Sequence, residues 1–205
     1  MLTLDHLAVS AATLQEGVAA VEAALGVTLA PGGHHAAMGT HNRLLSLGPG
    51  LYLEVIAIDP AAPAPGRARW FDLDNFAGAP RLSNWIARCE DLDAALARAP
   101  RGTGAVMDLA RGDLRWQMAV PGDGKLPFDG MFPALISWKG AAHPAAMLPE
   151  AGCRLIGVEV YHPRAEDLRH ALRGLLDDPL VALHQAPEVA LRALIDTPSG
   201  RKVLE

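Results

Sequence analysis

The sequence predicts an α+β fold in which a strand–helix–strand–strand–strand unit occurs three times. Runs that alternate apolar and polar residues, as strands do, outnumber runs with helical spacing. Each helix-like run follows one strand and precedes three more. A stretch rich in proline and glycine, residues 60–80, separates the first two units. Because a repeated unit of this kind cannot bury its own sheet face, we expect copies to pair.

The first unit, residues 1–59, is organised around a hairpin. Two apolar runs flank Gly48-Pro49-Gly50, and a short loop with glycines and a proline is typical of a turn between strands. The helix before the hairpin is expected to stop at Gly26. Pro31-Gly32-Gly33 is expected to break a short strand. The expected elements are a strand Leu2–Val9, a helix Ala12–Leu25, a short strand Val27–Ala30, and hairpin strands Asn42–Leu47 and Leu51–Ile58.

The second unit, residues 81–140, and the third, residues 151–205, repeat this order. We expect residues 1–150 to hold the paired units and residues 151–205 to form an additional one. The elements expected in the second unit are Leu82–Cys89, the helix Asp91–Ala99, Ala105–Asp108, Leu114–Val120 and Met131–Trp138. Those in the third are Leu155–Tyr161, the helix Ala165–Leu176, Leu180–His184, Val189–Ile195 and Arg201–Leu204.

Composition narrows the classes of protein and partner. The net charge is −5, and no basic run interleaved with aromatic residues occurs, which argues against nucleic acid as a partner. Cys89 and Cys153 lack metal-type spacing, so we expect a reducing cytoplasm rather than a disulfide framework. Asp5 and His6 interrupt the apolar start of the chain, so we expect neither a signal peptide nor a membrane span.

Glu54 is a carboxylate inside an otherwise apolar strand, on the face opposite Leu53 and Val55. An unpaired buried carboxylate is costly, so we expect a partner, and His6 in the first strand is the obvious candidate. If the two strands are neighbours with these faces aligned, both side chains point into one concavity. A metal ion or a polar ligand could bind there. A purely structural hydrogen-bonded pair is the alternative.

Short motifs occur in order along nearly the full length of the chain. They are Asp5-His6-Leu7-Ala8-Val9, His35-x-x-x-Gly39-Thr40-x-Asn42, Tyr52-Leu53-Glu54-Val55-Ile56, Trp85-x-x-Arg88-x-x-Asp91-Leu92, and Trp138 followed by His143-Pro144. This set resembles the glyoxalase-like domain family of the vicinal oxygen chelate superfamily, which includes glyoxalase I, extradiol dioxygenases and bleomycin-resistance proteins. The resemblance implies that units one and two pair into a half-open eight-stranded cup with helices outside.

The resemblance also implies a site in the cup. In the superfamily the first and last strands of each unit supply metal ligands. Here that implies His6 and Glu54 as catalytic residues and as ligands of a divalent ion (Zn, Fe, Mn or Ni). The second unit departs from the pattern, because Trp85, or Asn84 after a one-residue slip, stands where His6 would. Its closing strand contains neither an acid nor a histidine.

Five further residues are expected to contact a substrate: Asn42, His35, Trp85, Arg88 and Trp138. Each has a plainer alternative. Trp85 and Trp138 could pack in the core, Arg88 could form a surface ion pair, and Asn42 could hold the mouth of the sheet together. His35 could brace the turn that follows it.

Two functions stay open. In the first, a small oxygen-rich organic molecule binds in the cup, a divalent ion acts as a Lewis acid, and Glu54 moves a proton, in lyase, isomerase or dioxygenase-like chemistry. His34, His35 or His41 could supply a missing ligand, although we expect His34 and His41 to be solvated. In the second, the protein binds or sequesters a small ligand without metal, as bleomycin-resistance proteins do. The third unit is expected to cover a sheet edge or to pair across a homodimer axis.

Overall fold

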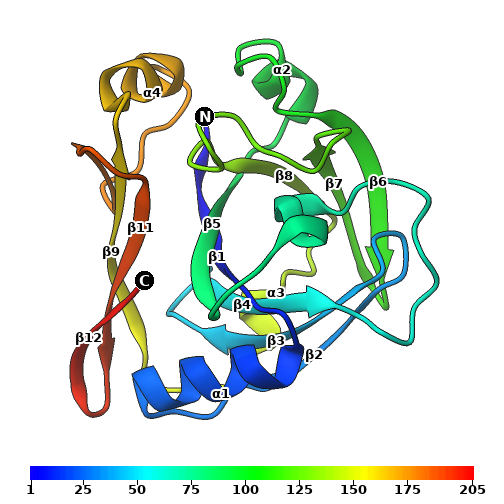
Figure 1. Ribbon diagram of the computed structural model, residues 1–205, viewed down its shortest axis with the longest axis vertical. Helices are drawn as coiled ribbons and strands as arrows, with labels where there is room; N and C mark the ends of the chain where they lie inside the picture. The colour runs from blue at the N-terminus through cyan, green and yellow to red at the C-terminus, as the bar shows by residue number, and fades with distance from the viewer.

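The computed structural model describes all residues from Met1 to Glu205, and eight of its twelve strands form one curled sheet (Figure 1). The first unit consists of β1 (Thr3–Ser10), α1 (Leu14–Leu25), β2 (Ala30–His35), β3 (Thr40–Ser46) and β4 (Tyr52–Ile58). The second consists of β5 (Arg81–Arg88), α2 (Leu92–Leu96), β6 (Ala105–Arg111), β7 (Leu114–Val120) and β8 (Ala134–Lys139). The short helix η1 (Trp70–Asn75) lies in the connection, and α3 (Pro144–Met147) follows β8.

The strand order β2-β3-β4-β1-β5-β8-β7-β6 is symmetric about its centre. β1 and β5 pair antiparallel there, and each last strand, β4 or β8, pairs parallel with the first strand of its own unit. The predicted α+β class and the pairing of two units into an eight-stranded cup are therefore confirmed. No helix of the structure combines the length and the apolar character that crossing a membrane requires.

The third unit consists of β9 (Arg154–His162), α4 (Ala165–Leu172), β10 (Val181–Gln185), β11 (Ala190–Thr197) and β12 (Gly200–Leu204). It keeps the order of elements but not the pairing. β10 lies parallel beside β9, and β11 lies antiparallel on the other side of β9, so the second sheet has the order β10-β9-β11-β12.

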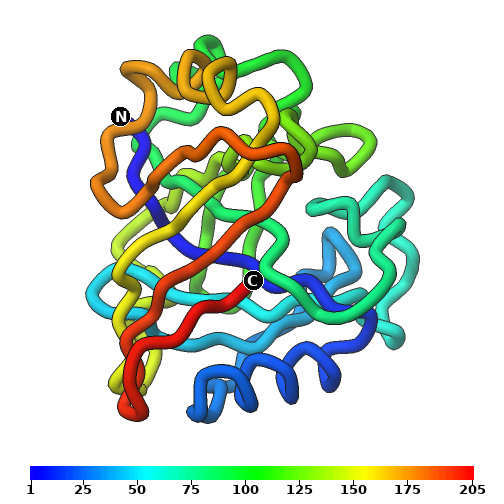
Figure 2. Tube along the Cα trace, turned by 60° about the vertical axis from the view of Figure 1, so that its left-hand side comes forward, coloured from blue at the N-terminus to red at the C-terminus, as the bar shows by residue number.

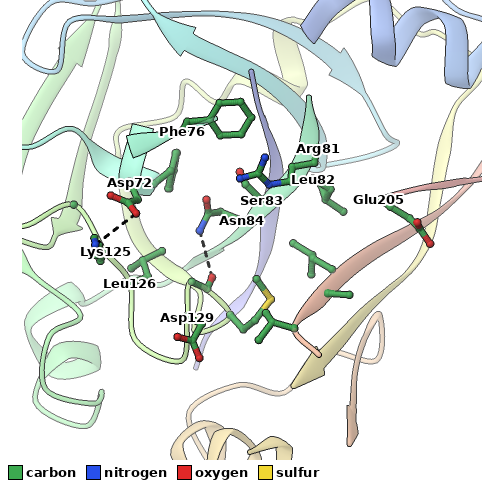
Figure 3. A pocket seen from close by; sticks show the side chains of 17 residues that line it. Asp72, Phe76, Arg81, Leu82, Ser83, Asn84, Lys125, Leu126, Asp129 and Glu205 are labelled. Carbon is green, nitrogen blue, oxygen red and sulfur yellow. Dashed lines mark hydrogen bonds and ion pairs between the residues drawn. The ribbon is translucent and has the colours of Figure 1, made fainter. Parts of the chain in front are cut away.

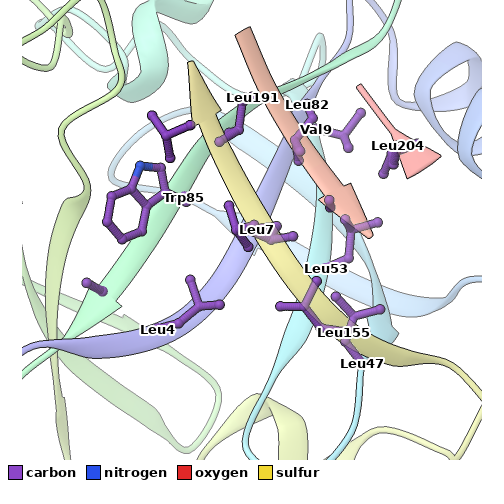
Figure 4. Close-up of a cluster of buried hydrophobic side chains, with 14 of the residues drawn as sticks. Leu4, Leu7, Val9, Leu47, Leu53, Leu82, Trp85, Leu155, Leu191 and Leu204 are labelled. Atoms are coloured by element: carbon purple, nitrogen blue, oxygen red, sulfur yellow. The ribbon is translucent and has the colours of Figure 1, made fainter. Parts of the chain in front are cut away.

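The second sheet packs face to face on the outer side of the cup, where β9 and β11 cross over β1 and β5 (Figures 1, 2 and 4). Leu7, Leu53 and Trp85 of the cup share this core with Leu155 and Leu191. Fully burying one such leucine contributes about 1.5–3 kcal/mol. The third unit thus covers a sheet face within the same molecule rather than the expected sheet edge, and its pairing across a dimer axis stays a prediction.

Helix α1 begins at Leu14, two residues after the expected start at Ala12, with Thr13 as its N-cap. The Thr13 hydroxyl accepts from the backbone N–H of Glu16 and donates to the Glu16 carboxylate, so it satisfies one of the free N–H groups at the start of the helix. Gly26 ends the helix in the left-handed conformation, as expected. Val21 and Leu25 are buried against the sheet.

Strand β2 contradicts the prediction that Pro31-Gly32-Gly33 breaks a strand, because these residues lie inside it. β2 is an edge strand, where a proline costs no ladder hydrogen bond. The glycines are there because nothing larger fits. A Cβ on Gly32 would lie 2.2 Å from the carbonyl oxygen of Asn42, and one on Gly33 would lie 2.8 Å from the side chain of Arg111.

Candidate functional site

Asp5 and His6 are neighbours in β1, yet both side chains turn into the cup. The pairing of β1 with β5 shifts by one residue between Leu4 and His6. Such a β-bulge places two consecutive residues opposite one partner and re-aims a side chain. Leu4 and Leu7 on either side keep facing the outer core.

Asp5 is fully buried and accepts hydrogen bonds from four side chains. Its Oδ1 accepts from His6 Nδ1 at 2.6 Å. Its Oδ2 accepts from Trp138 Nε1 at 3.1 Å, from His143 Nε2 at 3.0 Å and from Arg88 Nη1 at 3.3 Å. Burial alone would raise the pKa of Asp5, but the hydrogen bonds from the two histidines outweigh it and hold the pKa well below its ordinary value.

His143 holds one defined tautomer. Its Nδ1 accepts from the backbone N–H of Ala145 at 3.2 Å, so Nε2 carries the proton that it donates to Asp5. The residue also packs edge-on against Trp138, with ring centroids 5.0 Å apart. His143 therefore connects the loop after β8 to the polar network of the cup.

The structure brings His6 and Glu54 face to face across the cup. His6 Nε2 lies 3.6 Å from Glu54 Oε2. Burial opposes ionisation of both groups, but the carboxylates of Asp5 and Glu54 raise the pKa of His6. Against its own burial, contacts with His6, His35 and Asn42 lower the pKa of Glu54 to about 2. Both shifts favour the charged forms, an imidazolium at His6 beside the carboxylates of Asp5 and Glu54.

His35 is buried beside this pair but is neutral. Arg111 Nη1 donates to His35 Nε2 at 3.1 Å, and a guanidinium can only donate, so the His35 proton must lie on Nδ1, which faces Thr40 Oγ1 at 3.1 Å. Burial lowers the pKa of His35 to about 4. His35 therefore both braces the turn before Thr40 and lines the cup.

Asn42 is oriented by two donors. Its Oδ1 accepts from the backbone N–H of Gly33 at 2.8 Å and from Arg111 Nη1 at 3.1 Å. Its amide nitrogen is thereby turned toward Glu54, to which it donates at 2.5 Å. The β2–β3 arm thus holds the Glu54 carboxylate in place.

The cavity between these groups has a volume of about 30 Å³, room for roughly two water molecules. Its polar floor is formed by His6, His35, Asn42, Glu54 and Arg111. Its walls are mainly aromatic: Tyr52, Trp70, Phe71, Trp116 and Trp138, with Met118 and Ile136. The indole N–H of Trp70 is buried and has no hydrogen-bond partner. It is therefore an unused donor in the cavity wall.

Trp85 and Arg88 do not line this cavity. Trp85 lies opposite Leu7 in the β1–β5 ladder, so it faces the outer core, where its Nε1 donates to Met131. The expectation that Trp85 contacts a substrate in the cup is therefore wrong, and Asn84 takes the inward-facing register. Arg88 is half-exposed outside the cavity and donates to Asp5 and to the carbonyl of Gly50. Of the two expected tryptophans, only Trp138 lies in the wall.

Four residues of the site were missed by the sequence analysis: Asp5, Trp70, Arg111 and His143. Asp5 and His143 stand inside motifs that were noted, so their position was a usable signal. Trp70 lies in a proline- and glycine-rich connection, and Arg111 ends the opposite edge strand, so no local pattern ties either residue to Glu54.

The cup does not complete a metal site. His6 Nε2 and the Glu54 carboxylate are the two donors that face each other. The remaining acceptors nearby, His35 Nε2 and Asn42 Oδ1, already accept from Arg111. Zinc sites in proteins use three or four protein ligands, and the guanidinium of Arg111 would repel a second cation. On the side of the cup formed by the second unit, β5 and β8 contribute the apolar side chains of Ile86, Ala134 and Ile136, which cannot bind a metal ion.

A larger cavity, about 730 Å³, lies elsewhere, between β5, the loop at 124–131 and β11 (Figure 3). Cavity volume alone would place the binding site there, whereas the buried charged side chains place it in the cup. We place the site in the cup, because buried ionised groups are costly and cluster at functional sites. In the large cavity Lys125 pairs with Asp72, and Asn84 donates to Gly130. Phe71 lines both cavities.

Comparisons with known proteins agree with this architecture. A hypothetical protein from Staphylococcus aureus has the same fold, with 13% identity over 92% of this chain and 88% of that chain and a TM-score of 0.64. Methylmalonyl-CoA epimerase from Mycobacterium tuberculosis is similar more distantly, with 20% identity over 70% of this chain and 91% of that chain and a TM-score of 0.43. None of the curated proteins matches the chain.

The family model of the glyoxalase-like domain matches residues 4–176, which include the whole cup and much of the third unit. The chain therefore belongs to the glyoxalase-like domain family of the vicinal oxygen chelate superfamily.

Proposed function

We propose that the cup binds a small oxygen-rich organic molecule and moves a proton on it, with Glu54 as the base and His6 as the acid. The observation that carries this proposal is the buried His6–Glu54 pair. Nε2 of His6 lies 3.6 Å from Oε2 of Glu54, and both side chains line the cavity. Paired groups whose pKa values are driven apart are the usual arrangement for acid–base catalysis.

The donors around the cavity favour an oxygen acceptor as the bound group. His6 presents an N–H, Trp70 has an unused indole N–H, and Arg111 bonds protein groups through Nη1 only. The rest of the guanidinium is therefore open to a carbonyl or carboxylate oxygen. Because the cavity is only about 30 Å³ in this structure, the aromatic side chains of its walls would have to move apart to admit the carbon skeleton, which they would then hold.

Binding would activate Glu54. The contact with His6 lowers the pKa of Glu54. A ligand carbonyl that takes over the N–H of His6 would remove this contact and raise the basicity of the carboxylate. Glu54 would then take a proton from the carbon next to that carbonyl, while His6 and Arg111 stabilise the oxyanion that forms.

A second candidate, metal-free binding or sequestration of a small ligand, is favoured by the aromatic walls and by the apolar second half of the cup. It shares the binding step and lacks the proton transfer. An exchange experiment therefore separates the two functions.

We would incubate the protein in D2O with small α-hydroxyketones, 2-oxo acids and 1,3-dicarbonyl compounds, and follow binding and carbon-bound deuterium by NMR. The proposal expects exchange that Glu54→Gln abolishes while binding persists and that the exposed Glu166→Gln leaves unchanged. Binding without exchange would support sequestration. Exchange that survives Glu54→Gln would contradict the role given to this carboxylate.

A further inference from the structure

A cluster of two histidines and one aspartate lies on the outer surface, at the rim of the first unit. His34 is the next-to-last residue of β2 and lies directly opposite His41 of β3 in the ladder. Asp59 follows the last residue of β4. One ligand atom from each residue lies within 4.8 Å of the others. His34 Nδ1 is 2.6 Å from Asp59 Oδ2, and the two imidazole centroids are 5.9 Å apart.

The backbone of the rim holds the carboxylate in place. The backbone N–H of Asp59 donates to Gly39, and its Oδ1 accepts from the backbone N–H of Ala61 at 3.0 Å. Oδ2 is therefore left for His34. The carboxylate is nearly buried, while the His34 side chain is 73% exposed and free to adjust.

We propose that His34, His41 and Asp59 form a binding site for a divalent transition-metal ion, with Zn²⁺ as the best fit, separate from the cup. Two imidazoles and one carboxylate are a common protein ligand set for Zn²⁺, with water in the fourth position. Tetrahedral bonds of about 2.1 Å place ligand atoms about 3.4 Å apart. His34 Nδ1 and Asp59 Oδ2, now 2.6 Å apart, would therefore separate slightly, which a rotation of the exposed His34 ring allows, and any ligand pair that lies farther apart would close in around the ion. The ion replaces the proton between Nδ1 and Oδ2, and the imidazole carries its proton on the solvent-facing Nε2.

The site would act on the cup through the strands that carry it. His35 and Asn42 are the next residues after His34 and His41, and their side chains point to the opposite side of the sheet, into the cup. An ion that joins β2, β3 and the end of β4 would hold this arm in the position in which Asn42 donates to Glu54.

The test is calorimetric titration of the tag-free protein with Zn²⁺, together with the visible absorption of bound Co²⁺. We expect one ion per chain, and an affinity at least about tenfold weaker in His34→Ala and in His41→Ala. The exposed His170→Ala is the matched control and should bind like the wild type. Because both tested histidines are on the surface, circular dichroism should report unchanged folding.

The proposal would be overturned by a wild-type protein that binds no ion, by binding that survives both histidine substitutions, or by binding that is lost equally in His170→Ala. A wild-type ion that is lost in Glu54→Gln but kept in His34→Ala and His41→Ala would also overturn it, because the ion would then lie in the cup. The test is independent of any substrate, so it does not depend on the function proposed for the cup.

Discussion

Asp5 is the residue on which the polar network of the cup depends most. It accepts from His6, Arg88, Trp138 and His143, which come from three parts of the chain: β1, β5 and the end of β8 with the loop after it. Its negative charge also raises the pKa of His6. A carboxylate–imidazole pair of this kind fixes the tautomer and the orientation of the ring. Asp5 is thus a positioning residue that acts through His6.

Replacing Asp5 with Asn should destabilise the fold by about 3 kcal/mol, because a buried charged partner is removed and its donors are left unpaired. Urea denaturation followed by circular dichroism measures the change. Asp177→Asn, at an exposed position, is the control and should stay near the wild type. A loss no larger than that of the control would mean that the network adds nothing to stability.

The lowered pKa of His35 predicts a pH dependence of stability. The unfolded chain protonates this imidazole near its model value of 6.5 and the folded chain only near 4. Between these values the unfolded state binds more protons, so His35 lowers stability as the pH falls from 6.5 to 4, by about 3 kcal/mol in total. Glu54 adds a further loss as the pH falls from 4.5 toward 2, because its folded pKa is depressed.

Denaturation of wild type and His35→Gln between pH 7 and pH 4 tests this dependence. The variant should have a shallower slope between the pH values of 6.5 and 4. His6 has the opposite sign, because its raised pKa makes its contribution fade as the pH rises through its folded value. Equal slopes in the two proteins would show that His35 does not titrate as described.

For individual residues, the sequence predicted the facing of side chains that follow the regular alternation of a strand. It missed side chains whose position depends on a β-bulge or on a strand that is distant in the sequence. Because side chains alternate along a strand, Glu54 was expected on the face opposite Leu53. In the structure Glu54 lines the cavity of the cup and Leu53 packs in the outer core. Asp5 was missed because strict alternation would place it and His6 on opposite faces. Trp85 was placed in the cup because a one-residue slip exchanges the two faces of a strand.

At the scale of elements, the strands that line the cup owe their positions to two irregularities. The bulge in β1 turns Asp5 and His6 to the same side. The glycines of β2 let Asn42 and Arg111 approach the backbone closely. Both follow from contacts with strands remote in sequence, so local propensity could predict the strands and not these features.

Gly32→Ala should destabilise the β2–β3 arm by about 1–3 kcal/mol, because the added Cβ would overlap the carbonyl of Asn42 and force the strands apart. Thermal unfolding measures the effect. Gly122→Ala is the control, since nothing lies within 4 Å of its Cβ position and its backbone needs no left-handed conformation. An alanine at residue 32 that is tolerated as well as the one at residue 122 would refute the close approach.

For the molecule as a whole, the third unit is part of the core and not an appended domain. Its sheet and the outer side of the cup share one apolar cluster, which includes Leu7, Trp85 and Leu191 (Figure 4). The element order predicted a third unit, but the sequence could not show which surface it covers. The homodimer expected from the sequence stays a prediction. The apolar face of the third unit is already covered by the cup of the same chain, so it does not need a second copy.

A chain ended at residue 150 should lose cooperative unfolding, because the apolar outer face of the cup would be exposed to water. Near-ultraviolet circular dichroism and thermal unfolding report the loss of fixed packing. A truncated chain that unfolds as sharply and at the same temperature as the full one would show that residues 1–150 fold alone.

The central claim is that an imidazolium at His6 faces the Glu54 carboxylate inside the cup. The nitrogen chemical shifts of the His6 ring, followed by NMR across neutral pH, test it most directly. We expect His6 to be protonated on both nitrogens at pH 7, and its pKa to fall in Glu54→Gln because one of the two carboxylates that raise it is gone. A His6 that is neutral at pH 7, or whose pKa does not respond to Glu54→Gln, would contradict the account.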